Sequence, residues 1–288
     1  MAVKALACEL PSRRGLPLSR LSLADLQADA VGRGLVASIG RTTLWRWLSE
    51  DAIRPWYHRS WIFPRDPEFS VKAGRILDLY EGCWEGIPLT DSDYVLSTDE
   101  KTSIQARHRK HLCSPPGAGR RRRVEHEYER AGSFAYLAAW DVRRAKLFGY
   151  CQTATGIVPF RELVSQVMSQ EPYRSAQRVF WIMDNGSSHR GQRSIERLQT
   201  EWKQIIPVHT PVHASWLNQI EIYFSIIQRK VLTPNTFESV AQAQERLLQF
   251  QQQYEALARP FEWRFTRRDL QRIMSRIDQA DSHQRAVA

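Results

Sequence analysis

Cysteine is scarce in this sequence, and long apolar runs are missing. The four cysteines lie far apart and form no Cys-x-x-Cys pair, so neither a zinc ribbon nor a dithiol redox motif is indicated. No run of about 18 apolar residues occurs, and no continuous hydrophobic segment lies near the start, so we predict neither a membrane span nor a secretory signal. We therefore expect reduced thiols, no membrane partner and a cytoplasmic location in a bacterial cell.

Basic residues, by contrast, are in excess. The 41 lysines and arginines outnumber the 31 acidic residues, which gives a formal net charge of +10 and a pI near 9.7. Most of the basic residues are arginines, whose guanidinium group suits bidentate contact with phosphate oxygens. Nucleic acid is therefore the first candidate partner, and an ordinary solvated basic surface is the alternative.

The first 60 residues have the pattern of short helices. Ser22 is placed to cap a helix over LADLQADAV, and a second helix is predicted over residues 38–50. Its buried side would hold Ile39, Leu44, Trp47 and Leu48. Its exposed side would present residue types that contact phosphates and base edges: Arg41, Thr42, Thr43 and Arg46. We predict a helix-turn-helix DNA-binding region at 1–60, with an ordinary helical bundle as the alternative.

A segment rich in proline, arginine and aromatic residues, 54–67, predicts a domain boundary. We assign 61–90 to a linker and a connecting helix over 71–84, and 91–288 to a domain in which strands alternate with helices. Strands are predicted at 94–100, 133–141, 146–151, 178–184 and 204–209. Helices are predicted at 159–169, 192–203, 216–232 and 238–258. This order predicts an α/β domain with a mixed sheet whose first three strands form a meander.

Three acidic residues fall at informative places in this pattern. Asp99 lies at the end of the first strand and Asp184 at the end of the fourth, so neighbouring strands would bring both carboxylates to one end of the sheet, where ligands bind in open α/β sheets. Glu221 lies beside the apolar stripe of the long helix, which consists of Leu217, Ile220, Phe224, Ile227 and Val231. Taken alone, Asp184 in WIMDNGSSHR also fits a turn or a helix cap.

Three carboxylates from two strand ends and one helix favour hard divalent cations. Mg²⁺ prefers oxygen ligands and keeps positions open for water and substrate phosphates. Two such ions, about 4 Å apart, would activate the attacking oxygen of a phosphodiester reaction and stabilise the leaving oxygen.

Three segments resemble the DDE transposases of the insertion sequence 630 family, the bacterial relatives of mariner elements. They are STDE at 97–100, DNGSSH at 184–189 and HTPVHASWLNQIEIYFSIIQRKV at 209–231, and the third is the most specific. The gap between Asp184 and Glu221 holds 36 residues, close to the spacing of this group. The resemblance covers roughly residues 20–280.

The resemblance implies a ribonuclease-H-like mixed sheet with flanking helices, preceded by a small all-α helix-turn-helix domain. Asp99 and Asp184 match the two metal-binding aspartates and Glu221 matches the third catalytic acid, and together they would hold two Mg²⁺ ions or, as a substitute, Mn²⁺. The implied activity is that of an endonuclease and strand transferase acting on element ends and on target DNA, commonly at a TA dinucleotide. The implied partners are double-stranded DNA with terminal inverted repeats and a second copy of the chain. When bound to DNA, the protein would be associated with the nucleoid.

Residues near the three acids, and a run of arginines, can also be interpreted in the light of this resemblance. Asn218 would orient a metal-bound water or a DNA phosphate, or else make a hydrogen bond at the helix start. His189 is interpreted as a polar helix-start residue rather than a base, and Glu100 as a residue on the opposite face of the strand. The run in GRRRRVEHEYER is predicted to contact the DNA backbone rather than to be a solvated charge run: Arg120, Arg121, Arg122 and Arg123.

One feature departs from the family. Its members usually begin with two helix-turn-helix units, and one is evident here, so residues 1–20 are interpreted as the tail of a missing first unit. Two other functions therefore stay open beside transposition. One is a truncated, non-catalytic copy that occupies DNA and inhibits an intact partner. The other is a nuclease acting on RNA–DNA hybrids, against which the N-terminal region argues.

Overall fold

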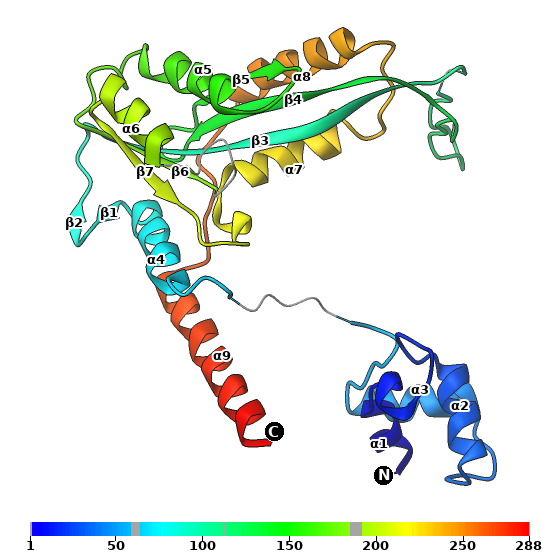
Figure 1. Ribbon diagram of the computed structural model, residues 1–288. Helices are drawn as coiled ribbons and strands as arrows, with labels where there is room; N and C mark the ends of the chain where they lie inside the picture. The colour runs from blue at the N-terminus through cyan, green and yellow to red at the C-terminus, as the bar shows by residue number, and fades with distance from the viewer. Residues whose placement is uncertain (1, 59–63, 112, 185–191, 288) are drawn as a thin grey trace. The chain divides into compact units, whose positions relative to one another are not determined.

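The computed structural model describes residues 2–58, 64–111, 113–184 and 192–287 (Figure 1). The chain divides into two compact units, residues 1–63 and residues 64–288. Side chains at 192–195 and from 280 onward are outside this description. Among the described helices, none is long and apolar enough to cross a membrane.

The N-terminal unit consists of three α-helices and a 3₁₀ turn around one small core. The helices are α1 (Ala2–Cys8), α2 (Leu23–Gly32) and α3 (Arg41–Glu50). The predicted cap of α2 is confirmed, because the hydroxyl of Ser22 accepts from the Asp25 backbone N–H and the Asp25 carboxylate accepts from that of Ser22 at 2.8 Å. The core combines residues from all three helices: Val3, Leu6, Leu26, Ala30, Leu44 and Leu48.

The interpretation of residues 1–20 as the tail of a missing first unit stays a prediction. In the structure, α1 buries Val3, Leu6 and Ala7 in the same core as α2 and α3. One expectation for this unit was wrong. Trp47 does not lie on the buried side of α3, since it is exposed, as is Trp45. The buried side of α3 is narrower than its sequence suggested and rests on Leu44 and Leu48.

The second unit is built on a five-stranded sheet with the order β5-β4-β3-β6-β7. Strands β3 (Asp93–His108), β4 (Glu129–Asp141) and β5 (Leu147–Gln152) form the predicted antiparallel meander. Strands β6 (Arg178–Met183) and β7 (Ile205–His209) continue the sheet in parallel with β3. The predicted mixed sheet is therefore confirmed.

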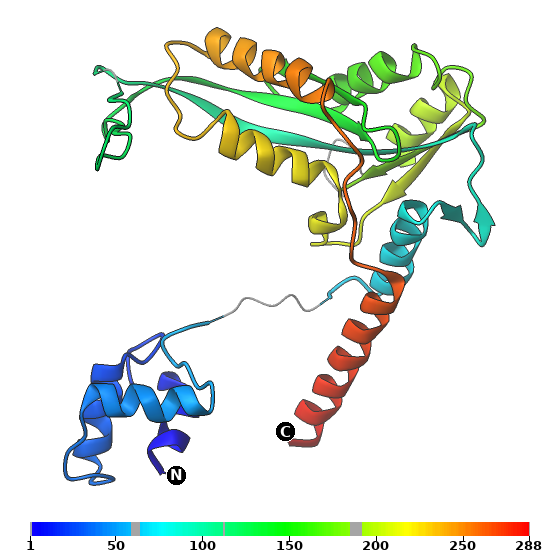
Figure 2. The same ribbon diagram turned by 180° about the vertical axis from the view of Figure 1, so that it is seen from behind.

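Helices cover both faces of this sheet (Figures 1 and 2). One face packs against α5 (Ile157–Met168) and α6 (Gln192–Glu201), and the other against α7 (Ile220–Lys230) and α8 (Val240–Glu255). Successive strand residues alternate between the two layers: Val95 lies in the core with α7, whereas Leu96 lies in the core with α5.

The β3–β4 hairpin is longer than the sequence predicted. Pairing continues outward to His108 and Glu129, and both strands run beyond the flanking helices (Figures 1 and 2). We call residues 107–130 the hairpin arm. The base of the arm is held by the segment after α7, where the Asn235 side chain accepts from the Arg107 backbone N–H at 2.9 Å and donates to the Gln105 carbonyl at 2.6 Å.

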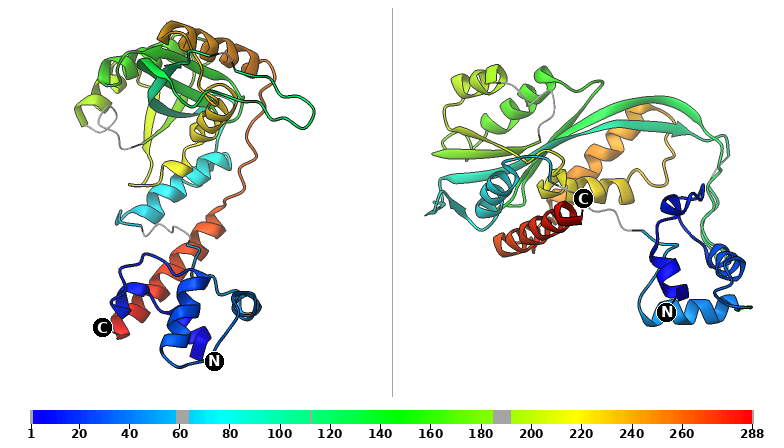
Figure 3. Two further views of the ribbon diagram at one scale, coloured as in Figure 1. Left: turned by 90° about the vertical axis from the view of Figure 1, so that its right-hand side faces the viewer. Right: turned by 60° about the horizontal axis from the view of Figure 1, so that its bottom comes forward.

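A helical pair accompanies the sheet. Helix α4 (Phe69–Tyr80) packs against the first part of α9 (Arg267–Val287), as Figures 1 and 3 show. A Cβ at Gly74 would lie 2.4 Å from the guanidinium of Arg267, so a larger residue there would displace this side chain, which pairs with Asp78 at 2.7 Å. Neither α9 nor the short hairpin of β1 (Cys83–Trp84) and β2 (Ile87–Pro88) was predicted.

Candidate active site

The two predicted aspartates lie on neighbouring strands. Strands β3 and β6 pair in parallel, with Ser97 opposite Ile182. The same register, carried two residues further, sets Asp99 beside Asp184, directly after β6 ends at Met183. The predicted neighbourhood of the two strands is therefore present. Asp99 is not at a strand end, however, because β3 continues to His108.

All three predicted acids belong to one face of the sheet. Phe180 and Ile182 of β6 lie in the core with α7, so alternation puts Asp184 on that side, and the same holds for Asp99, four residues after Val95. Glu221 occupies the first turn of α7 and lies close enough to Asp184 for their charges to interact.

Glu221 is the acid whose electrostatics are perturbed. Burial raises the pKa of its carboxyl above the ordinary value, Lys101 opposes that rise, and the charge of Asp184 adds to it. Asp99 is held differently, because one of its carboxylate oxygens accepts the Glu100 backbone N–H at 2.7 Å. Within the described part of the chain, no three carboxylate, imidazole or thiol groups are close enough to hold a metal ion as they stand. The donor set nevertheless fits a hard cation, since it offers carboxylate oxygens from one face.

Lys101 is the residue of this site that the sequence interpretation missed. It follows Asp99 by two residues in STDEK, so the alternation of the strand already predicted that both share a face. Its side chain is half-buried, and burial lowers the pKa of its ammonium group while Glu221 opposes that shift. Lys101 and Glu221 line one cleft together with the outer side of α7.

Asn218 fixes the start of α7 against β3. Its amide nitrogen donates to the Thr98 carbonyl at 2.8 Å, and its amide oxygen accepts from the Ser97 hydroxyl. That hydroxyl also accepts from the Ile220 backbone N–H at 2.8 Å. The side chain of Asn218 is fully buried, so it does not face a water or phosphate, and the helix-start alternative describes its contacts.

Tyr80 of α4 adds a second tether at the same place. Its hydroxyl donates to the Leu217 carbonyl at 2.7 Å and accepts from the Gln219 backbone N–H at 3.3 Å. Burial raises the pKa of this phenol, which keeps it a neutral donor. Glu221 therefore projects from a helix whose first turn is bonded to both the sheet and α4.

The remaining predicted residues lie elsewhere. In α3, Arg41, Thr42 and Arg46 are exposed and Thr43 is half-buried. Glu100 is on the face opposite the acids, where its charge acts on Tyr150. His189 lies outside the described residues. The four arginines of the charge run are exposed near the end of the hairpin arm, among the short bridges Ser114–Arg123 and Gly117–Arg120: Arg120, Arg121, Arg122 and Arg123.

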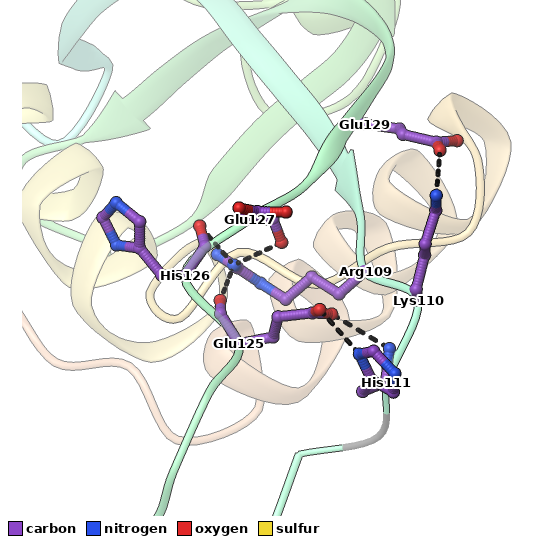
Figure 4. Close-up of polar contacts among 7 residues, drawn as sticks. All are labelled: Arg109, Lys110, His111, Glu125, His126, Glu127 and Glu129. Atoms are coloured by element: carbon purple, nitrogen blue, oxygen red, sulfur yellow. Dashed lines mark hydrogen bonds and ion pairs between the residues drawn. The ribbon is translucent and has the colours of Figure 1, made fainter.

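Between these arginines and the base of the arm, polar contacts join its two sides (Figure 4). The guanidinium of Arg109 donates to three consecutive carbonyls, those of Glu125, His126 and Glu127. His111 contacts the Glu125 carboxylate through its ring at 2.6 Å and its backbone N–H at 2.9 Å. Among the described residues of the arm, these contacts join its two sides, and none of these residues belongs to an apolar core cluster.

Comparison with known proteins gives one family match in sequence. The sequence pattern of the DDE superfamily endonucleases matches residues 94–244. No curated protein matches the chain in sequence.

Solved structures share the fold at low identity. The Mos1 transposase paired-end complex with the left transposon end has a TM-score of 0.51 at 11% identity, over 96% of this chain and 76% of that chain. The Mos1 mariner paired end complex with Mn has a TM-score of 0.50 at 12% identity, with the same coverage. The Mos1 strand transfer complex has a TM-score of 0.50 at 11% identity, again with the same coverage. This likeness confirms the ribonuclease-H-like fold.

The matched region contains Asp99, Asp184 and Glu221 and spans more than half of the sequence. The chain belongs to the DDE superfamily of endonucleases.

Proposed function

We propose that this protein is a transposase of the insertion sequence 630 family, which binds the ends of its own element and carries out DNA cleavage and strand transfer. The observation that supports this best is the common face of Asp99, Asp184 and Glu221, within the region that matches the endonuclease family. The similar structures are complexes of a transposase with a transposon end and a strand transfer complex, which supports the same reaction class here.

The three acids are proposed to hold two Mg²⁺ ions, with Mn²⁺ as a substitute. When bound, such ions activate the attacking oxygen and stabilise the leaving oxygen of the phosphodiester. The protein's own part is to keep Asp99 on a paired strand and Glu221 on a tethered helix, so that negative charge is concentrated at one place before DNA arrives. A Mos1 complex with Mn is among the similar structures, which supports divalent metal use.

Double-stranded DNA is the proposed partner, both as terminal inverted repeats and as a TA-type target, and a second copy of the chain would hold the other element end. We retain the division into a DNA-binding region at 1–60, a linker and connecting helix at 61–90 and a catalytic domain with C-terminal helices at 91–288. Residues of α3 would contact base edges and phosphates in the helix-turn-helix manner: Arg41, Thr42, Thr43 and Arg46. The arginines of the hairpin arm would contact the backbone: Arg120, Arg121, Arg122 and Arg123.

The decisive test is Mg²⁺-dependent nicking of DNA that carries the inverted repeats flanking this gene. The wild-type chain should nick this DNA, and Asp99→Asn or Asp184→Asn should reduce the rate by about a thousandfold or more, because losing one of three ligands disables the metal site. Glu100→Gln is the matched control, since this acid is adjacent to Asp99 on the opposite face. It should keep the rate within a few fold.

Each alternative makes a different prediction in the same assay. A non-catalytic copy binds the repeats and shows no nicking in wild type or variants. A hybrid-specific nuclease cleaves RNA–DNA duplexes without any need for repeat ends. Equal nicking by wild type and Asp184→Asn contradicts the assignment of the acids.

A further inference from the structure

A cleft leads away from the acids along the outer side of α7. Besides Lys101 and Glu221 it is lined by Phe224 and by three polar residues at the helix surface: Ser225, Gln228 and Arg229. The three polar residues follow Glu221 by four, seven and eight positions, which is the spacing of one helix face. The cleft therefore joins the acid site to an exposed row of hydrogen-bond donors.

Two side chains in this cleft carry a positive charge, Lys101 and Arg229. Among the described residues, neither the ammonium of Lys101 nor the guanidinium of Arg229 forms a hydrogen bond or an ion pair. Lys101 is nevertheless half-buried on β3, where burying a cation is unfavourable unless an anion compensates for it. Glu221 provides a part of that compensation from across the cleft.

The length of the cleft suits a short piece of one nucleic-acid strand. From Glu221 to Arg229 the helix rises by about 12 Å, which is the axial rise of three to four nucleotides. A backbone phosphate offers each cation an anionic partner, and the Ser225 hydroxyl and Gln228 amide offer donors for the oxygens between them.

We propose that this cleft is a backbone-binding subsite in which Lys101 contacts the phosphate next to the one that is cut and Arg229 contacts a phosphate further along the same strand. This rests on the proposed function, because the acids define which phosphate is cut. Lys101 is then a positioning residue, whose positive charge offsets the repulsion between the DNA phosphates and the three carboxylates. Arg229 sets the direction in which the DNA strand leaves the site.

The test is the salt dependence of DNA binding, measured with a duplex of about 30 base pairs in Mg²⁺ and with Asp184→Asn in every protein to prevent cleavage. The slope of log K against log salt is negative, and Lys101→Met and Arg229→Gln should each reduce its magnitude by about 0.9, since each neutralised phosphate releases counterions. The double variant should reduce the magnitude by about twice that. Lys101→Arg keeps the charge and should restore the parent slope.

Lys230→Gln is the matched control, because Lys230 is exposed on the same helical turn but does not line the cleft. Its slope should stay that of the parent. An unchanged slope in Lys101→Met, or an equal fall in Lys230→Gln, overturns the proposal. If Lys101→Met does not fold, as judged by its thermal unfolding, the comparison of Arg229→Gln with Lys230→Gln decides. Failure of the proposed function is separate, since it would appear as absent nicking by the wild type with the slope differences intact.

Discussion

The β3–β4 hairpin joins two regions that are held together by different forces. Its inner part, residues 93–101 and 136–141, is covered by helices on both faces, and its side chains are largely buried. Its outer part, the hairpin arm, is exposed and is held by ion pairs, carbonyl contacts and Arg107 over the ring of Tyr128 at 4.5 Å. The hairpin thus has an inner part of paired and buried strands and an outer part, mostly beyond the strands, that is exposed to solvent.

This difference matches the two tasks proposed for the hairpin. Asp99 needs a fixed position, which close packing provides, because packed interiors resist displacement of their side chains. Arginines that contact a DNA backbone need reach and charge rather than a unique position, and exposed charged contacts contribute little to stability. The comparison predicts that stability depends on the inner part and salt-dependent binding on the arm.

The largest expected effect is on the free energy of unfolding, which should respond more to a substitution in the inner part of the hairpin than to one in the arm. Trp140 of β4 is fully buried and packs on Phe261 with ring centroids 4.7 Å apart. Trp140→Ala should lower the free energy of unfolding by about 3–5 kcal/mol, through lost burial and the cavity it leaves. Tyr128→Ala, in the arm, should cost about 1 kcal/mol or less. Hydrogen exchange of the β3 and β4 amides in the full chain measures both, and similar losses would contradict the comparison.

A second test uses acid. The Asp93 carboxylate is buried and paired with Arg178, which donates at 2.7 and 2.8 Å and lowers the pKa of Asp93 to about 2. Because this pKa is depressed, the stabilisation is present above pH 4 and is lost as pH falls from about 4 through 2. It amounts to about 2 kcal/mol.

Asp93→Asn should therefore lower stability at neutral pH and flatten the acid limb of the stability–pH curve between pH 4 and 2. Glu125→Gln is the control from the arm. His111 likewise lowers the pKa of Glu125, but this pair is exposed to solvent and should change the curve much less. Urea unfolding at a series of pH values measures the difference, and parallel curves for wild type and Asp93→Asn would contradict the prediction.

The sequence predicted the inner part of the hairpin better than the outer part. In the inner part, apolar residues mark the strands, and the parallel pairing of β3 with β6 brings Asp99 beside Asp184. Beyond Glu100, a mostly polar sequence hid eight further residues of β3, 101–108, the last two of which belong to the arm. Their partners on β4 and the support at Asn235 are distant in sequence.

Long-range contacts also explain the errors at the site. The alternation that placed Asp99 also marked Lys101, but its importance depends on Glu221 across the cleft, which no local pattern reveals. From the sequence, Asn218 could orient a metal-bound water or a DNA phosphate, or make a hydrogen bond at the helix start. Its partners Ser97 and Thr98 decide between the two, and they lie about 120 residues earlier. Helix propensity predicted α7 itself, whereas its tether to Tyr80 depends on tertiary packing.

The smallest expected effect on stability is also the most direct test of the arm. Replacing the four arginines of the charge run by glutamine should change the free energy of unfolding by less than about 0.5 kcal/mol, because these side chains are exposed. It should reduce the magnitude of the slope of log K against log salt by about 0.9 for each arginine that neutralises a phosphate. The replaced residues are Arg120, Arg121, Arg122 and Arg123.

A control with the same change in net charge comes from the C-terminal region. Four arginines there are equally exposed: Arg264, Arg268, Arg272 and Arg276. If the arm contacts the backbone directly, replacing this second set by glutamine should leave most of the slope intact. If both quadruple variants lower the slope equally, binding responds to the overall charge of the protein, and the arm has no special part in it. A loss of stability when Arg120, Arg121, Arg122 and Arg123 are replaced would show instead that these arginines support the structure of the arm. A change in DNA binding could then not be assigned to their charge alone.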